Sequence, residues 1–153
     1  MDTNLAYVAG LIDGEGCVHL DTPRRTYRAR VSVGMTEPAL PLLQQLRTEW
    51  GGTLYQLRPA TARWAAAWTW HLTGGPAVAL LTAIRPYLRL KGAQADAAME
   101  VERIRSSLAR RANGQLAWTE EARQACEAVK MRMHAMNAKG PRTLASAPNA
   151  EVA

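Results

Sequence analysis

Two carboxylates lie between glycines near the start of the chain, in the segment Asp13-Gly14-Glu15-Gly16. The residues before it, 5–12, are small and apolar on nearly every side, which predicts a helix that is buried all round. We expect Asn4 to cap this helix and glycine, in the left-handed conformation, to end it near Asp13. Both carboxylates then lie at the negative end of the helix dipole, where a bound cation would relieve the repulsion. Taken alone, the four residues also fit an acidic helix end without a ligand.

The next two segments alternate between polar and apolar residues, which predicts strands with one covered face. They cover 17–21 and 27–35 and are joined by the turn residues 22–25, as in an antiparallel hairpin. Further strands are expected over 53–58 and 64–72, and helices over 36–50, 77–87, 93–110 and 119–136. This order predicts an α+β fold, α-β-β-α-β-β-α, with one four-stranded antiparallel sheet, helices on one face and C-terminal helices added. We expect residues 1–138 to form one domain and 139–153 a disordered tail.

Composition limits the partner and the compartment. The 153 residues carry 19 Lys+Arg against 13 Asp+Glu, a net charge of +6, which favours an anionic partner. The two cysteines, 17 and 126, form no metal or disulfide pattern and indicate a reducing compartment. No signal peptide or membrane span is recognisable, so we expect a cytoplasmic protein of bacterial or phage origin, or an organellar one.

The stretch Val8-Ala9-Gly10-Leu11-Ile12-Asp13-Gly14-Glu15-Gly16 resembles the signature of the LAGLIDADG homing endonucleases. The resemblance extends from about Asn4 to about Lys91. It implies that Glu15 binds the divalent metal used to cut DNA, Mg²⁺ or another divalent cation, with the Gly14 carbonyl directed to the same place. Glutamate replaces the commoner aspartate and keeps the carboxylate.

Two further active-site positions follow from the same resemblance. The segment 86–95, Pro-Tyr-Leu-Arg-Leu-Lys-Gly-Ala-Gln-Ala, resembles the one that carries the family's lysine and makes Lys91 the match. An ammonium there could stabilise phosphate charge or polarise water. The third polar position falls on Glu37, a weaker match because many members carry glutamine, and the alignment could shift to Thr36.

The family's motif helix packs against a twin, yet the chain contains no second copy of the motif. An exposed apolar helix costs free energy at about 25 cal/mol per Å², so we expect a homodimer with two-fold symmetry. The expected interface residues are Leu5, Ala6, Ala9, Gly10, Ile12 and Asp13.

The sheet face without helices is the expected surface for double-stranded DNA, although a polar sheet face is often simply solvated. His19 and His71 lack a supporting cluster of cysteines or carboxylates, which argues against zinc. The third strand leaves two registers open, one presenting Thr53 and Tyr55 and the other Gln56 and Arg58. The candidate DNA-binding residues are Cys17, His19, Asp21, Arg24, Arg25, Arg28, Arg30, Ser32, Tyr55, Arg58, Arg63, Thr69 and His71.

These features together predict a site-specific double-strand DNA endonuclease of the homing type, associated with intron or intein mobility. It would cut a near-palindromic site as a homodimer by metal-dependent hydrolysis. Two alternatives keep the same fold: an intron maturase that binds RNA, and a DNA-binding regulator that does not cut.

Overall fold

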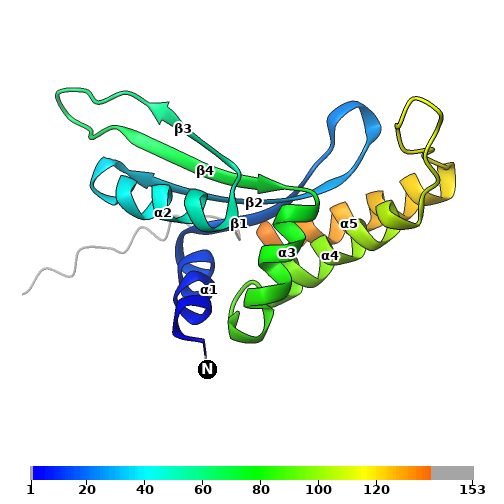
Figure 1. Cartoon of the computed structure of the whole chain (residues 1–153), viewed down its shortest axis with the longest axis horizontal. Helices are drawn as coiled ribbons and strands as arrows, with labels where there is room; N and C mark the ends of the chain where they lie inside the picture. Colours follow the sequence, from blue (N-terminus) through cyan, green and yellow to red (C-terminus); the bar gives the residue numbers. More distant parts are fainter. Residues whose placement is uncertain (1, 139–153) are drawn as a thin grey trace, which may run out of the picture.

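Four antiparallel strands form one sheet in the order β1-β2-β4-β3 in the computed structural model, which describes residues 2–138. The strands are β1 (Gly16–Asp21), β2 (Arg28–Thr36), β3 (Thr53–Arg58) and β4 (Ala67–Thr73). The β1–β2 and β3–β4 hairpins project at opposite ends of the sheet (Figure 1). This confirms the expected four-stranded antiparallel sheet.

The helices lie on one face of the sheet and leave the other face open (Figure 1). The helices are α1 (Thr3–Glu15), α2 (Leu40–Trp50), α3 (Gly75–Ile84), α4 (Gly92–Ser107) and α5 (Glu120–Asn137). Short 3-10 segments are η1 (Pro23–Arg25), η2 (Glu37–Ala39) and η3 (Arg85–Tyr87). The predicted α+β arrangement, with helices on one face and additional C-terminal helices, is therefore confirmed.

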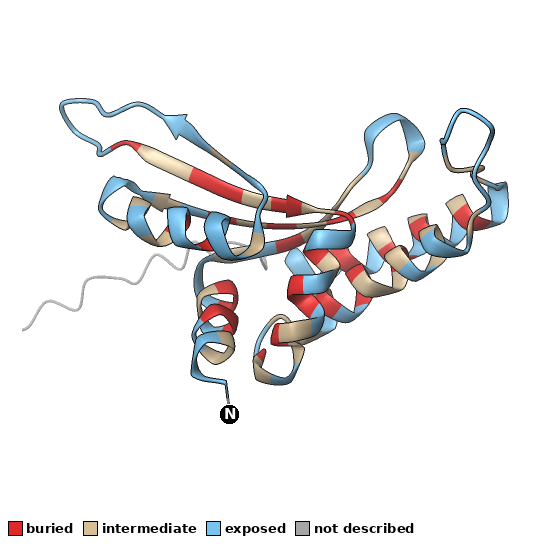
Figure 2. Ribbon diagram, viewed as in Figure 1, coloured by how far each residue is buried: buried red, intermediate tan, exposed pale blue. Residues whose placement is uncertain are grey.

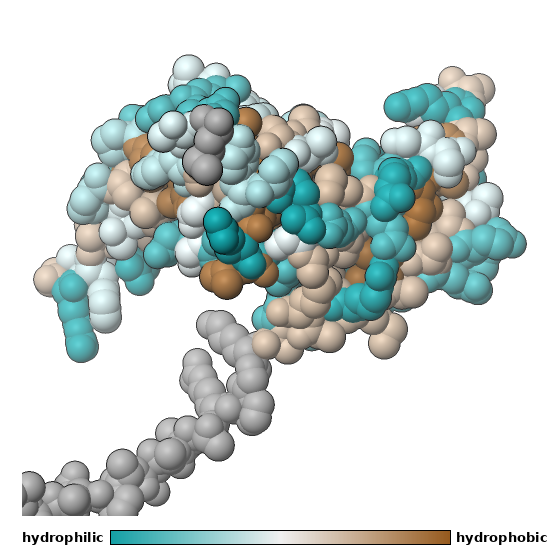
Figure 3. All heavy atoms as spheres, turned by 90° about the horizontal axis from the view of Figure 1, so that it is seen from below, coloured by the Kyte–Doolittle hydropathy of each residue, from teal (hydrophilic) through white to brown (hydrophobic). Residues whose placement is uncertain are grey.

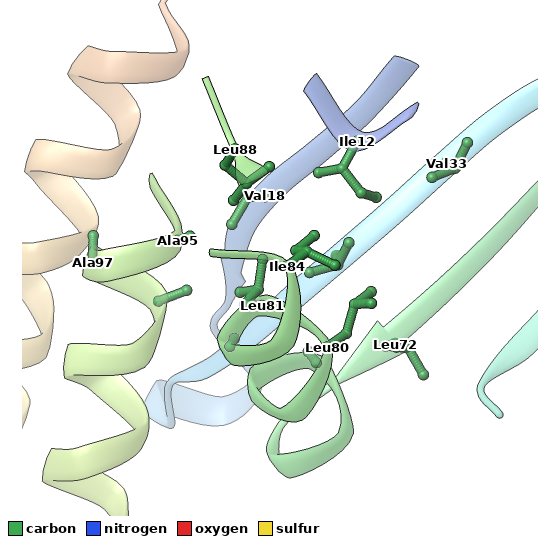
Figure 4. Packing of buried hydrophobic residues seen from close by; sticks show 14 of the residues in the cluster. Ile12, Val18, Val33, Leu72, Leu80, Leu81, Ile84, Leu88, Ala95 and Ala97 are labelled. Atoms are coloured by element: carbon green, nitrogen blue, oxygen red, sulfur yellow. The ribbon is translucent and has the colours of Figure 1, made fainter. Parts of the chain in front are cut away.

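The core lies between the sheet and the helices. Burial alternates along β2, where Ala29, Val31 and Val33 face the helices. Ile12 of α1 meets side chains of α3 and of the sheet there (Figure 4). Each fully buried Leu, Ile or Val of this kind stabilises the fold by about 1.5–3 kcal/mol. The buried residues lie on the inner sides of the helices in Figure 2, and the outer sides are exposed.

The first helix begins and ends differently from the prediction. Its N-cap is Asp2 rather than Asn4, because Asp2 Oδ1 accepts from the backbone N–H groups of Asn4 and Leu5 at 3.0 and 3.2 Å. The expected left-handed glycine at its end is wrong: Gly14 is helical, and Gly16 follows with an extended backbone at φ −82°. Gly16 is needed for close approach instead, since a Cβ there would lie 2.7 Å from the Ile12 carbonyl oxygen.

The fourth strand begins at Ala67 rather than at Trp64. Trp64 belongs to the β3–β4 hairpin loop, where a turn is closed by a hydrogen bond of 2.8 Å from Thr61 N–H to the Trp64 carbonyl. Trp68 and Trp70 face the core as expected, and Trp70 is fully buried.

The predicted disordered tail, 139–153, lies outside the described residues and stays a prediction. Within residues 2–138, no helix has the length and hydrophobicity needed to cross a membrane.

Candidate active site and nucleic-acid interface

The end of α1 is joined to the start of α4 by one carboxylate and one ammonium. Asp13 accepts hydrogen bonds from the backbone N–H groups of Arg89, Leu90 and Lys91 at 2.7, 3.2 and 2.9 Å. The Lys91 ammonium donates in return to the carbonyl oxygens of Ile12, at 2.9 Å, and Asp13. Each charge thus neutralises the opposite pole of a helix dipole, and together they fix Lys91 beside the turn that ends in Glu15.

Asp13 is therefore not a free carboxylate at the end of α1. Burial acts to raise its pKa, but the backbone hydrogen bonds from Arg89, Lys91 and Leu90, with the Lys91 charge, outweigh burial and lower the pKa. The prediction that Asp13 and Glu15 are both free carboxylates at the end of α1 is therefore wrong for Asp13. Only Glu15 remains available to a cation.

We expect replacement of Asp13 by Asn to lower the free energy of unfolding by about 1–3 kcal/mol, because an amide cannot satisfy three N–H donors as a carboxylate does. The lowered folded pKa means that the contribution of Asp13 is present above about pH 4 and is lost as the pH falls through the folded value. Urea unfolding at pH 7 and at pH 3 tests both statements. The gap between wild type and Asp13→Asn should shrink at pH 3, and an equal gap at both values would contradict this account.

Glu15 is exposed at the last position of α1, directly before β1. It lines an open hollow of about 480 Å³ with the end of β2, including Thr36, and with Leu57 and Trp68. Glu37 begins η2, is exposed, and is not among the residues that line this hollow. Thr36 therefore fits a position beside Glu15 better than Glu37 does.

The donor set around Glu15 suits a hard cation only in part. An exposed carboxylate and helix-end carbonyls are oxygen ligands of the kind that Mg²⁺ prefers. Within the described part of the chain, however, no three His, Cys, Asp or Glu side chains come together to hold a metal. One chain offers one free carboxylate, so a metal would need further oxygen ligands from another molecule.

Strand pairing brings most of the predicted DNA-binding residues onto one sheet face, because directly paired antiparallel residues share a face. Cys17, His19 and Asp21 pair with Ser32, Arg30 and Arg28. Ser32 pairs in turn with His71, and Gly34 with Thr69. This is the open face of Figure 1.

A bulge resolves the register of the third strand. Thr53 and Tyr55 pair with His71 and Thr69, so they share the open face, and the Tyr55 ring lies 5.8 Å from the His71 ring. The register shifts between Gln56 and Arg58, and Arg58 then pairs with Ala67. One extra residue reverses the alternation, so Tyr55 and Arg58 share the open face although the unbroken strand pattern made them alternatives.

The two hairpins extend this face with basic residues. Arg24 and Arg25 form the β1–β2 tip and adopt left-handed backbone angles, φ 50° and 60°. At the β3–β4 hairpin, Arg58 ends β3 and Arg63 lies in the loop, and their guanidinium groups lie 5.8 and 5.4 Å from the centre of the Trp64 ring. Both loops are exposed.

The open face combines a few ion pairs with unpartnered donors. Asp21 lies 3.3 Å from Arg30 and 3.4 Å from Arg28, so its carboxylate orients the two arginines. Burial lowers the pKa of His19 and of His71, which favours neutral imidazoles that can donate or accept. Within residues 2–138, the Nε atoms of Arg28 and Arg30 and the Nδ1 atom of His71 are buried without a hydrogen-bond partner. A hydrogen-bonding ligand on this face would satisfy them.

The outer face of α1 differs from the predicted interface. Ala9, Ile12 and Asp13 are 0%, 0% and 8% exposed, so they face their own core and cannot meet a partner helix as predicted. Leu5 and Ala6 are half-buried. Figure 3, which views the molecule from below, shows hydrophobic residues at the surface among hydrophilic ones.

Three residues present that outer face: Tyr7, Gly10 and Gly14. Their spacing of three and four residues places them on one side of the helix. Tyr7 is 56% exposed, and a Cβ added at Gly10 or Gly14 would meet nothing within 4 Å. Tyr7 and Gly14 were missed as surface positions; fixing Ile12 as inward-facing and counting along the helix would have found them.

No protein-family model and no curated protein sequence matches the chain. Solved structures do match. The homing endonuclease I-CvuI in complex with its target has a TM-score of 0.69 at 18% identity, over 93% of this chain and 87% of that chain. The archaeal intron-encoded homing endonuclease I-Vdi141I, complexed with DNA, has a TM-score of 0.67 at 14% identity, over 93% and 89%. The LAGLIDADG meganuclease I-AabMI, bound to uncleaved DNA, has a TM-score of 0.65 at 14% identity, over 83% of this chain and 43% of its own.

Proposed function

From the LAGLIDADG homing endonuclease fold of this chain, we propose that it is a site-specific double-strand DNA endonuclease that acts as a homodimer with a divalent metal. The observation that carries the proposal is the separation of roles at the end of α1. The Asp13 carboxylate is fully occupied by backbone hydrogen bonds, whereas Glu15 is exposed. The Lys91 ammonium is bound to the carbonyl oxygens of Ile12 and Asp13, three and two residues before Glu15. A free carboxylate at the C-terminal end of a helix is repelled by the helix dipole, and a bound cation would relieve that repulsion.

Glu15 and the Gly14 carbonyl would hold the metal, Mg²⁺ or another divalent cation. Such an ion would relieve charge on the scissile phosphate and supply an activated water. Two chains related by a two-fold axis would bring two Glu15 carboxylates together and complete the ligand set that one chain lacks. I-CvuI complexes with DNA were obtained with 2 mM Ca and, with the DNA not cleaved, with 2 mM Mg, which supports the binding of a divalent cation here.

Lys91 would assist from its fixed position. An ammonium carries three donors, and Lys91 uses two of them on the carbonyls of Ile12 and Asp13. The third remains for a phosphate oxygen or a water beside Glu15, where it would stabilise developing negative charge.

The open sheet face would read the DNA. A two-stranded ribbon fits the major groove, and arginine can donate two hydrogen bonds to guanine. Each sheet would cover about one helical turn, roughly ten base pairs, so the dimer would recognise a near-palindrome about twice that length.

Replacement of Arg30 by Ala should relax sequence choice at particular positions, by about 1–3 kcal/mol for each base that it reads. Arg30 is suited to this because its guanidinium is oriented by Asp21 at 3.3 Å and its Nε is unpartnered within residues 2–138. Binding of wild type and variant to duplexes altered at each position measures the effect. Arg47→Ala, on α2 of the opposite side, is the matched control. Uniform weakening on all sequences would place Arg30 on phosphate instead.

The function itself is tested by incubating the protein with a randomised plasmid library and Mg²⁺ and sequencing the ends produced. We expect cuts at a recurring, two-fold symmetric sequence. Duplex binding without any cut would favour the non-cleaving regulator, and selective binding to structured RNA would favour the maturase.

A further inference from the structure

Five arginines line one hollow at the end of the sheet where the β1–β2 hairpin projects. It has a volume of about 420 Å³ and lies between the tip of the β1–β2 hairpin and the segment that joins α4 to α5. Both segments rise at the same end of the molecule in Figure 1. None of the ten lining residues is acidic, and the five arginines are Arg24, Arg28, Arg105, Arg111 and Arg123.

The hollow is preformed. The rings of Tyr27 and Trp118, both in its wall, lie 5.7 Å apart. The Tyr27 hydroxyl donates to Glu127 of α5 at 2.6 Å, and this hydrogen bond raises the pKa of Tyr27 to about 12, so the link persists over the usual pH range. A hydrogen bond of 2.8 Å from Arg111 N–H to the Gln115 carbonyl shapes the segment opposite the hairpin. Little ordering would therefore be needed on binding.

The positive charges of the hollow are only partly neutralised by the protein. Arg105 pairs with Glu102 at 2.7 Å and Arg28 with Asp21 at 3.4 Å, but Arg123 is 4.0 Å from its nearest carboxylate. Within residues 2–138, Arg24 and Arg111 form no ion pair. The Nε atoms of Arg28 and Arg123 are buried without a partner in the same part of the chain. Converging guanidinium groups of this kind match an anion with several oxygens, and phosphate accepts from them in pairs.

The hollow lies about one strand length away from the candidate active site. The strand β1 starts directly after Glu15 and runs for six residues toward the hairpin tip. At about 3.3 Å per residue the tip lies about 20 Å away. Since one strand of duplex DNA advances about 3.4 Å per base pair, this is about six base pairs from the centre of cutting.

We propose that the five-arginine hollow binds a backbone phosphate of the duplex in the flank of the target, on each side of the dimer. The inference rests on the proposed function for its partner, duplex DNA, and adds a site that contacts no base. Its contribution is sequence-independent: it fixes the register of the sheet on the groove and adds affinity through counterion release.

The salt dependence of binding tests the hollow. Wild type, Arg24→Gln and Arg111→Gln would be titrated with a random-sequence duplex of about 40 base pairs in Ca²⁺ over a range of KCl concentrations, by fluorescence anisotropy. Arg24 and Arg111 are chosen because no ion pair of the fold depends on them. We expect each variant to reduce the slope of log K against log[salt] by about 0.9 per phosphate lost, about twice that for a dimer, with equal loss on every sequence. Arg47→Gln on α2 removes the same charge away from the hollow and should leave the slope unchanged.

Two outcomes would overturn the inference. One is a wild-type slope in both hollow variants. The other is tight binding of inorganic phosphate alone to wild type, lost in Arg111→Gln, with no change in DNA binding, since the hollow would then serve a free phosphate ion. The salt slope is measured without cleavage. A changed slope in a protein that never cuts DNA would therefore contradict only the proposed endonuclease activity. If the protein cuts DNA but the hollow variants keep the wild-type slope, only the proposed phosphate site in the hollow would be contradicted.

Discussion

Replacing Glu15 by glutamine is expected to abolish the proposed DNA cleavage while leaving the proposed DNA binding intact. Glutamine keeps the size and hydrogen-bonding capacity of the side chain but removes the charge that would hold the metal. Loss of about 4 kcal/mol of metal-assisted stabilisation slows the cut about a thousandfold. The measurement is single-turnover cleavage of the bound target in Mg²⁺, with binding followed separately in Ca²⁺.

The structure makes this substitution a clean test. Glu15 is exposed, whereas Asp13, two residues earlier, is committed to three backbone N–H groups and would damage the fold if replaced. Removing a negative charge from the C-terminal end of α1 also relieves an unfavourable interaction with the helix dipole, so the variant should be at least as stable as wild type. Glu121→Gln, an exposed position in the first turn of α5, is the matched control. Cleavage by Glu15→Gln at nearly the wild-type rate would remove Glu15 from the site.

The sheet was predictable because its signals are local. Alternation over 17–21 and 27–35 requires one covered face, and the strand pairing agrees with it. The same alternation placed His19, Arg30 and Ser32 together correctly. Arg58 could not be placed in this way, because a single bulge reverses the alternation and leaves no unambiguous mark in the sequence.

The end of α1 was harder to predict for a different reason. Asp13 and Glu15 are two residues apart and look alike in the sequence. Asp13 is bound and Glu15 is free because of backbone N–H groups that lie 76 to 78 positions after Asp13. Long-range contacts of this type also decide which side of an apolar helix is covered. Ala9 and Ile12 were expected to meet a partner but are fully buried by their own chain.

The arginine hollow could not be predicted from the sequence either, because it also depends on long-range contacts. Its arginines come from the first hairpin, from α4, from α5 and from the segment between these two helices. Net charge indicates an anionic partner, but only the packing of α5 against the hairpin through Tyr27 and Glu127 gathers the charges in one place.

The substitution of Gly10 by arginine is expected to convert the proposed homodimer into a folded monomer. Gly10 lies on the outer face of α1, and a side chain there meets nothing within 4 Å in its own chain. Arginine also favours the helix over glycine by up to about 1 kcal/mol, so the fold of the single chain should not suffer. Between two close-packed α1 helices, by contrast, an unpaired buried charge costs about 3–5 kcal/mol. Dimer affinity should therefore fall by at least a hundredfold.

Sedimentation at micromolar concentration measures the change, and urea unfolding verifies that the chain remains folded. Gly75→Arg provides the matched control, because Gly75 is the first residue of α3 and also has open space around a Cβ. Cleavage should disappear with the dimer, since each chain contributes only one free carboxylate to the proposed metal site. A Gly10→Arg protein that stayed dimeric would show that the outer face of α1 is not the interface. A wild type that is monomeric and still cuts would show that the two-fold symmetric site itself is wrong.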